Sequence, residues 1–139
     1  MPTLAEKIAI IASGVFFMTG LLTGVWKYFA IMKSPNHQAP IYVDIAHRAA
    51  LMYAFACLVL LEFIKWSTLS DLVESLAAGF PILFFAIAIG TYVILGFTDH
   101  TDNQFKKRNF ITTTGMYLLI AGEVGGFAVL LVSALKNLL

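Results

Sequence analysis

The feature that most constrains this chain is an apolar run whose flanking charges stand closer together than the thickness of a lipid bilayer. Charges end at Arg48 and resume at Glu62, which leaves thirteen residues between them. At 1.5 Å per residue, a helix over that run is about 20 Å long, whereas the hydrocarbon core of a bilayer is about 30 Å thick. A membrane-spanning helix here must carry His47, Arg48 or Glu62 into the membrane. Ionisable groups at that depth are costly and mark candidate functional sites.

The composition supports a membrane environment for the whole chain. Hydrophobic residues make up 60% of the 139 residues and charged residues only 12%, whereas soluble domains carry about 25% charged residues. The lipid bilayer is therefore the expected surroundings. With a net charge of +1, nothing indicates a nucleic-acid partner, and we expect none.

Hydrophobic runs predict an all-α integral membrane protein, a bundle of four transmembrane helices that forms one domain over residues 1–139. The first run has no small-residue cleavage site after it, so we expect it to stay as an anchor. The expected helices cover about residues 8–32, 45–66, 77–98 and 110–133.

Basic residues predict the orientation of the bundle. Lys33 lies in the first connection, and Lys106, Lys107 and Arg108 lie in the third. Because short cytoplasmic loops are enriched in Lys and Arg, we expect both connections in the cytoplasm and both termini outside. The expected location is a bacterial inner membrane, crossed several times.

Two glycine pairs indicate close helix packing. Gly20 and Gly24 lie four residues apart in the first expected helix, and Gly122 and Gly126 in the fourth. Small residues at this spacing let helix backbones approach, either within one bundle or between subunits of a homo-oligomer. Pro81 falls in the first turn of the third expected helix, where proline is tolerated.

Aromatic residues from all four helices are expected at one depth. Trp26, Tyr53, Tyr92 and Tyr117 each lie roughly 9–11 Å inside the same membrane surface, at 1.5 Å per residue. They form either the wall of a cavity or an interfacial aromatic belt. Tyr53 lies about 240° around the helix from His47, so one of the two can face its own bundle and the other a neighbouring subunit.

His47 is the leading candidate for a metal ligand. Imidazole binds haem iron through one nitrogen while the other donates a hydrogen bond; the alternative is a histidine that bonds a loop carbonyl at the membrane interface. Arg48 suits a haem propionate or a lipid phosphate, or reaches to the headgroups. The single cysteine, Cys57, is not part of a Cys-x-x-Cys-His motif, which excludes covalent haem attachment.

Three further acidic sites require an explanation. Glu123 lies near the middle of the fourth helix, where a carboxyl must be protonated or paired; it is either an interhelical hydrogen-bond donor or a proton-handling group. Glu62 has Lys65 three residues on, so a local ion pair explains it. The cluster of Asp99, Asp102, Asn103 and Gln104 either covers a site or binds a cation, or forms a solvated loop; it has no metal-loop spacing.

The segment Ala46-His47-Arg48-Ala49-Ala50-Leu51, after a proline-containing loop and at the start of the second helix, resembles the styrene oxide isomerases and the related hydroxylaminobenzene mutases. These are small four-helix membrane proteins. The resemblance implies that His47 is the axial ligand of haem b, held between protomers of a trimer, and that ferric iron acts as a Lewis acid on an epoxide, which becomes an aldehyde by a hydride shift. Tyr92 stands near the active-site tyrosine of the isomerases. Tyr53 replaces their asparagine, a departure that puts an identical substrate in doubt.

These observations lead to three hypotheses about function. The first is a haem b-dependent isomerase, acting on a small apolar substrate that arrives through the bilayer. In it His47 holds the iron, Arg48 anchors a propionate, and Tyr92 and Tyr53 orient the substrate. The second is an electron-carrying haem protein, which needs a second axial ligand that no other helix-borne histidine supplies. The third is an accessory subunit of a larger membrane complex, for which the glycine-faced helices suffice.

Overall fold

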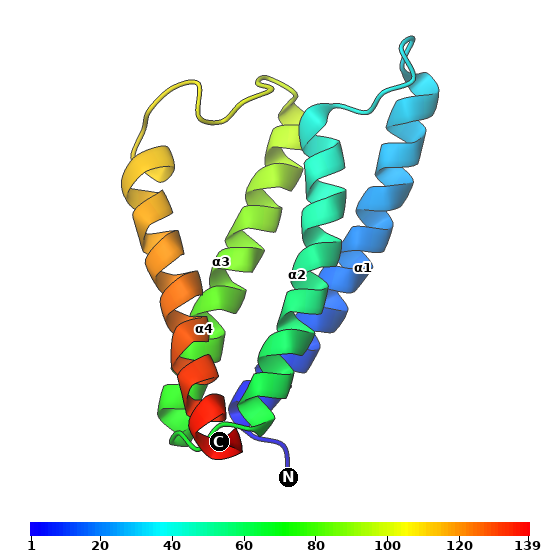
Figure 1. Cartoon of the computed structure of the whole chain (residues 1–139). Helices are drawn as coiled ribbons and strands as arrows, with labels where there is room; N and C mark the ends of the chain where they lie inside the picture. The colour runs from blue at the N-terminus through cyan, green and yellow to red at the C-terminus, as the bar shows by residue number, and fades with distance from the viewer.

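The computed structural model describes all 139 residues, and they form four long antiparallel helices without any β-strand. Both chain termini lie at one end of the molecule, together with the short connection between α2 and α3; the other two connections lie at the opposite end (Figure 1). The predicted all-α, four-helix fold is confirmed. The helices are α1 (Leu4–Lys33), α2 (Ile41–Lys65), α3 (Asp71–Thr98) and α4 (Met116–Leu138), with one π-helical turn, η1 (Ile111–Gly115), leading into α4.

All four helices are long and apolar enough to cross a membrane, counting η1 with α4. Large apolar side chains face outward over most of their length, for example Met52, Phe55 and Phe97. The buried residues are mostly small, with alanines prominent among them. This arrangement of small residues inside and large apolar residues outside is typical of helices that pack against each other in lipid. The chain is a multi-pass integral membrane protein.

The helices extend beyond the apolar runs by which they were predicted. α1 begins at Leu4 because Thr3 and Glu6 form a capping box, in which the Thr3 backbone N–H donates to the Glu6 carboxylate at 2.7 Å and the Glu6 N–H donates to the Thr3 hydroxyl at 3.2 Å. α3 begins at Asp71, six residues before the predicted start. Hydrophobicity marks the part of a helix that lies in lipid, whereas the start of α1 is set by its capping box.

The earlier start of α3 corrects the prediction for Pro81, which lies inside the helix and not in its first turn. Proline lacks the N–H that would bond the carbonyl oxygen of Ala77, four residues back. Gly126 of α4 packs at this place: a Cβ added there would lie 2.6 Å from the Ala77 oxygen and 2.8 Å from Pro81 Cδ. The Gly122–Gly126 pair therefore serves the contact between α4 and α3.

The first glycine pair is also used within the chain. A Cβ on Gly20 would lie 2.5 Å from Leu51 Cδ2, and a Cβ on Gly24 would lie 2.9 Å from His47 Cε1. Both glycines thus allow α2 to approach α1 closely. Of the two roles expected for the glycine pairs, internal packing is the one that the structure shows.

All four helices pack together at the end with the termini (Figure 1). At the other end α3 stays against α1 and α2, where a Cβ on Gly96 would lie 2.9 Å from Trp26 and 3.2 Å from Val43, whereas α4 leans away (Figure 1). The largest group of buried apolar residues joins all four helices and includes Ala9, Ala54, Cys57, Ala78 and Leu130. At the narrow end, the Ser133 hydroxyl of α4 accepts a hydrogen bond of 3.0 Å from the Thr68 backbone. α4 diverges from α2 above this region (Figure 1).

Candidate functional site

His47 is fixed between α2 and α1. Its Nδ1 atom lies 2.8 Å from the backbone carbonyl oxygen of Gly20. A carbonyl oxygen only accepts hydrogen bonds, so Nδ1 carries the proton and Nε2 of the neutral ring keeps a lone pair. The ring is partly exposed, and Nε2 has no hydrogen-bond partner within the chain. This is the arrangement of a histidine that binds a metal through Nε2 while a backbone carbonyl orients the ring.

The absence of a side chain at Gly24 makes room for that ring. A Cβ at this position would lie 2.9 Å from Cε1 and 3.1 Å from Nδ1 of His47. Gly20 supplies the carbonyl and Gly24 the space, four residues apart on one face of α1. The spacing that predicted close packing thus also positions the candidate ligand.

A row of charges lies beside His47. The Asp44 carboxylate forms two ion pairs. Its Oδ1 lies 2.5 Å from Nζ of Lys27 on α1, and its Oδ2 lies 2.8 Å from Nη2 of Arg48. The side chains of Lys27 and Asp44 are 29% and 31% exposed, and that of Arg48 is 65% exposed. The charges at the start of α2 therefore enter the membrane boundary as a paired group, which reduces the cost of placing them there. Arg48 keeps guanidinium N–H groups available for a second anion.

Tyr53 and Tyr92 lie on the other side of α2 from His47. The Tyr53 ring stacks on Phe85 of α3 with centroids 4.3 Å apart, and the Tyr92 ring stacks on Tyr42 at 6.1 Å. His47 contacts α1 instead. The angular separation expected from the helix period is confirmed, and within one chain the two tyrosines do not share a site with His47.

Glu123 of α4 lines a pocket together with Phe85 of α3, the residue on which Tyr53 stacks. Its Oε1 atom is buried and has no hydrogen-bond partner. The interhelical hydrogen bond expected for this residue is therefore not made by that oxygen. The sequence predicted Glu123 near the middle of the membrane but did not indicate that Phe85 would lie beside it, because this depends on how α4 leans against α3.

Glu123 lines an apolar groove with a volume of about 510 Å³, which we name the α2–α4 groove. Sites of about 300–1,000 Å³ commonly hold small molecules. Val59 and Val124 are 49% and 65% exposed, so the groove opens on the lipid-facing surface. Its walls include Val59 and Leu60 from α2, Phe85 from α3, and Glu123, Val124 and Phe127 from α4.

The other two aromatic residues of the predicted layer lie elsewhere. Trp26 stacks on Phe97 with centroids 4.3 Å apart, and Tyr117 is 76% exposed. The four residues do not line one cavity: Tyr53 and Tyr92 face the interior near α3, whereas Tyr117 faces lipid. The direction in which each residue points from its helix separates them.

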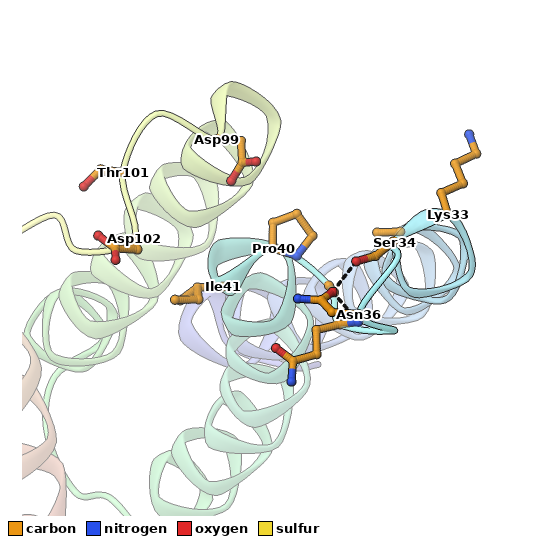
Figure 2. A pocket seen from close by; sticks show the side chains of 11 residues that line it. Lys33, Ser34, Asn36, Pro40, Ile41, Asp99, Thr101 and Asp102 are labelled. Carbon is orange, nitrogen blue, oxygen red and sulfur yellow. Dashed lines mark hydrogen bonds between the residues drawn. The ribbon is translucent and has the colours of Figure 1, made fainter.

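The remaining acidic residues lie near the helix ends. Glu62 forms an ion pair with Lys65, whose Nζ lies 3.1 Å from Glu62 Oε2. The predicted local pair is confirmed. At the opposite end, the α1–α2 loop and the segment after α3 enclose a polar pocket of about 520 Å³. Figure 2 shows Asp99 and Asp102 on one side of it and Asn36 on the other. No group of three or more His, Cys, Asp or Glu residues is placed to hold a metal ion.

Comparison with models of protein families, with curated proteins and with solved structures finds no match to this chain. Its chemistry is therefore inferred from two places on α2: the ring of His47 on the α1 side, and the α2–α4 groove with Glu123 on the other.

Proposed function

We propose that this chain is a haem b-dependent isomerase of a small apolar substrate, with His47 as the axial ligand. One observation carries the proposal: the Nδ1–H of His47 is bonded to the Gly20 carbonyl oxygen, while Nε2 is free at a partly exposed position. A hydrogen-bonded Nδ1–H fixes the tautomer and raises the basicity of the ligating nitrogen. The residues present thus fit a haem with one protein ligand.

Lewis-acid polarisation of an epoxide oxygen, followed by rearrangement to a carbonyl compound, is the chemistry that ferric haem with an open coordination position supplies when bound. The chain contributes the setting. Apolar side chains face outward around the site, which lets an apolar substrate enter from the bilayer and keeps water out. Arg48 pairs a propionate through the N–H groups that Asp44 leaves available.

Tyr53 and Tyr92 orient the substrate in this proposal, and their position requires a second protomer. Both stack on rings across the contact between α2 and α3, whereas His47 faces α1. A homo-oligomer, a trimer according to the family resemblance, would bring the His47 face of one protomer against α2 and α3 of its neighbour, between which Tyr53 and Tyr92 lie. A substitution that separates the protomers should therefore also abolish catalysis.

The location proposed for the protein is a bacterial inner membrane, with the α1–α2 and α3–α4 connections in the cytoplasm. Arg108, Lys107 and Lys106 in the second of these connections carry most of the charge bias.

The absorption spectrum of the detergent-purified protein, oxidised and reduced with dithionite, tests the haem proposal. We expect a Soret band that shifts on reduction and disappears in His47→Ala. The matched control is His100→Ala, because His100 lies in the exposed segment after α3 and bonds only Thr98. A colourless wild-type protein, even after expression with added haem, would overturn the proposal.

His47→Gly separates loss of the ligand from loss of the fold. If His47 binds the iron, added imidazole should restore the Soret band and the conversion of an aryl epoxide to its aldehyde. Pigment retained in His47→Gly without imidazole would remove the ligand assignment. The two alternatives have less support: no second helix-borne histidine exists for an electron-carrying centre, and both glycine pairs that suited an accessory subunit are used inside the chain.

A further inference from the structure

We infer that the α2–α4 groove binds a small lipophilic amine, whose ammonium group pairs with Glu123. The inference does not depend on haem or on His47, which contacts α1 on the other side of α2. It rests on the position of a carboxyl group in an apolar, aromatic-lined groove at the middle of the membrane.

At the depth of Glu123 a carboxyl is either protonated or paired, and a paired state needs a cation beside it. Glu123 lies twelve residues after Ile111 and fifteen before Leu138, or roughly 18 and 22 Å from the two helix ends at 1.5 Å per residue. Ionisable side chains at this depth pair with another group or face a functional cavity. Oε1 of Glu123 is buried and makes no hydrogen bond within the chain, so the molecule itself leaves it unsatisfied.

The chain has no basic residue that could satisfy Glu123. α3 contains no Lys, Arg or His, α2 contains none between Arg48 and Lys65, and α1 none between Lys7 and Lys27. A second copy of the chain, in either orientation across the membrane, therefore brings no cation to this depth. A cation that pairs with Glu123 therefore has to come from a separate molecule.

The walls of the groove indicate the rest of that molecule. Phe85 and Phe127 line it beside Glu123, and the Phe85 ring is held in place by Tyr53. Aromatic faces attract organic cations, and most strongly where water is excluded. The volume of about 510 Å³ suits a ligand with one ring and a short alkyl chain, and the exposed Val59 and Val124 at its mouth admit it from the lipid.

The experiment is calorimetric titration of the full chain in lipid nanodiscs with 4-phenylbutylamine and with 4-phenylbutan-1-ol. These two probes have the same apolar body and differ in charge. We expect the amine to bind at least about tenfold more tightly than the alcohol, as one favourable desolvated ion pair provides. Glu123→Gln should remove this preference without changing the affinity for the alcohol.

The matched control is Glu62→Gln, which removes an exposed carboxylate at the membrane edge and should bind both probes as the wild type does. Ala128→Phe fills the groove next to Glu123 and should weaken both probes. It keeps the test valid if Glu123→Gln fails to fold. Equal binding of amine and alcohol by the wild type, or unchanged amine binding in Glu123→Gln or in Ala128→Phe, overturns the inference. So does a loss of oligomer mass in Glu123→Gln without any change in amine binding, which would assign Glu123 to a subunit contact.

Discussion

The Nδ1–H of His47 donates to the backbone carbonyl oxygen of Gly20 across a distance of 2.8 Å. This bond connects α2 to α1 and leaves the opposite ring nitrogen pointing away from the carbonyl. It depends on two glycines: Gly20, whose missing Cβ lets α2 approach, and Gly24, above which the ring lies. The packing motif and the candidate ligand are thus parts of one structural unit.

A methyl group at Gly24 should disturb that unit. In Gly24→Ala the new Cβ would lie 2.9 Å from the His47 ring, so the ring must move and its bond to Gly20 lengthens. We expect a loss of about 1–3 kcal/mol in unfolding free energy, typical of overpacking, and weaker binding of added haem. Gly14→Ala is the control, because its Cβ meets nothing within 4 Å. Unfolding in mixed detergent micelles and haem titration measure both effects; equal values for the two variants would contradict the expectation.

The second glycine pair offers a sharper comparison between adjacent residues. Gly126→Ala places a Cβ 2.6 Å from the carbonyl oxygen of Ala77, a backbone atom that cannot rotate away, so α4 must shift from α3. We expect a loss of about 1–3 kcal/mol. Gly125→Ala meets nothing within 4 Å and should be neutral or slightly stabilising, since alanine favours helix. The same unfolding assay decides; a larger loss for Gly125→Ala would show that α4 has the opposite rotation.

Asp44 holds two cations at the membrane boundary, and its charge should matter more than that of Glu62. In Asp44→Asn, Lys27 and Arg48 lose their common carboxylate and repel each other. We expect a destabilisation of about 1 kcal/mol, at the upper end for partly exposed pairs. Glu62→Gln breaks one exposed ion pair and should cost less. A double-mutant cycle of Asp44→Asn with Lys27→Met isolates the interhelical pair; additive losses would mean that it contributes nothing.

The orientation in the membrane can be measured with introduced cysteines. Cys57 is fully buried and should not react with a membrane-impermeant maleimide, so the background is low. With both termini outside, Ser70→Cys should be labelled in intact cells, and Asp102→Cys only after the membrane is opened. The reverse pattern would overturn the orientation derived from the basic loop residues.

The limits of sequence reasoning are visible at Glu123 and Pro81. Hydrophobicity and charge spacing located Glu123 in the membrane, and the helix period separated His47 from Tyr53 correctly. Pro81 was placed in a first turn because α3 was expected to begin near residue 77, whereas polar residues from Asp71 onward continue the helix beyond the lipid. A helix end depends on local hydrogen bonds that an apolar window does not measure.

The number of helices and their ability to span a membrane followed from the sequence, because both depend on apolar length and a constant rise per residue. The neighbours of each residue came from the folded structure: Gly20 for His47, Phe85 for Tyr53, and no hydrogen-bond partner for the buried oxygen of Glu123. Rotation and tilt of a helix depend on how side chains of different helices pack together. Contacts between helices are therefore settled by the whole bundle, and not by the spacing within any one of them.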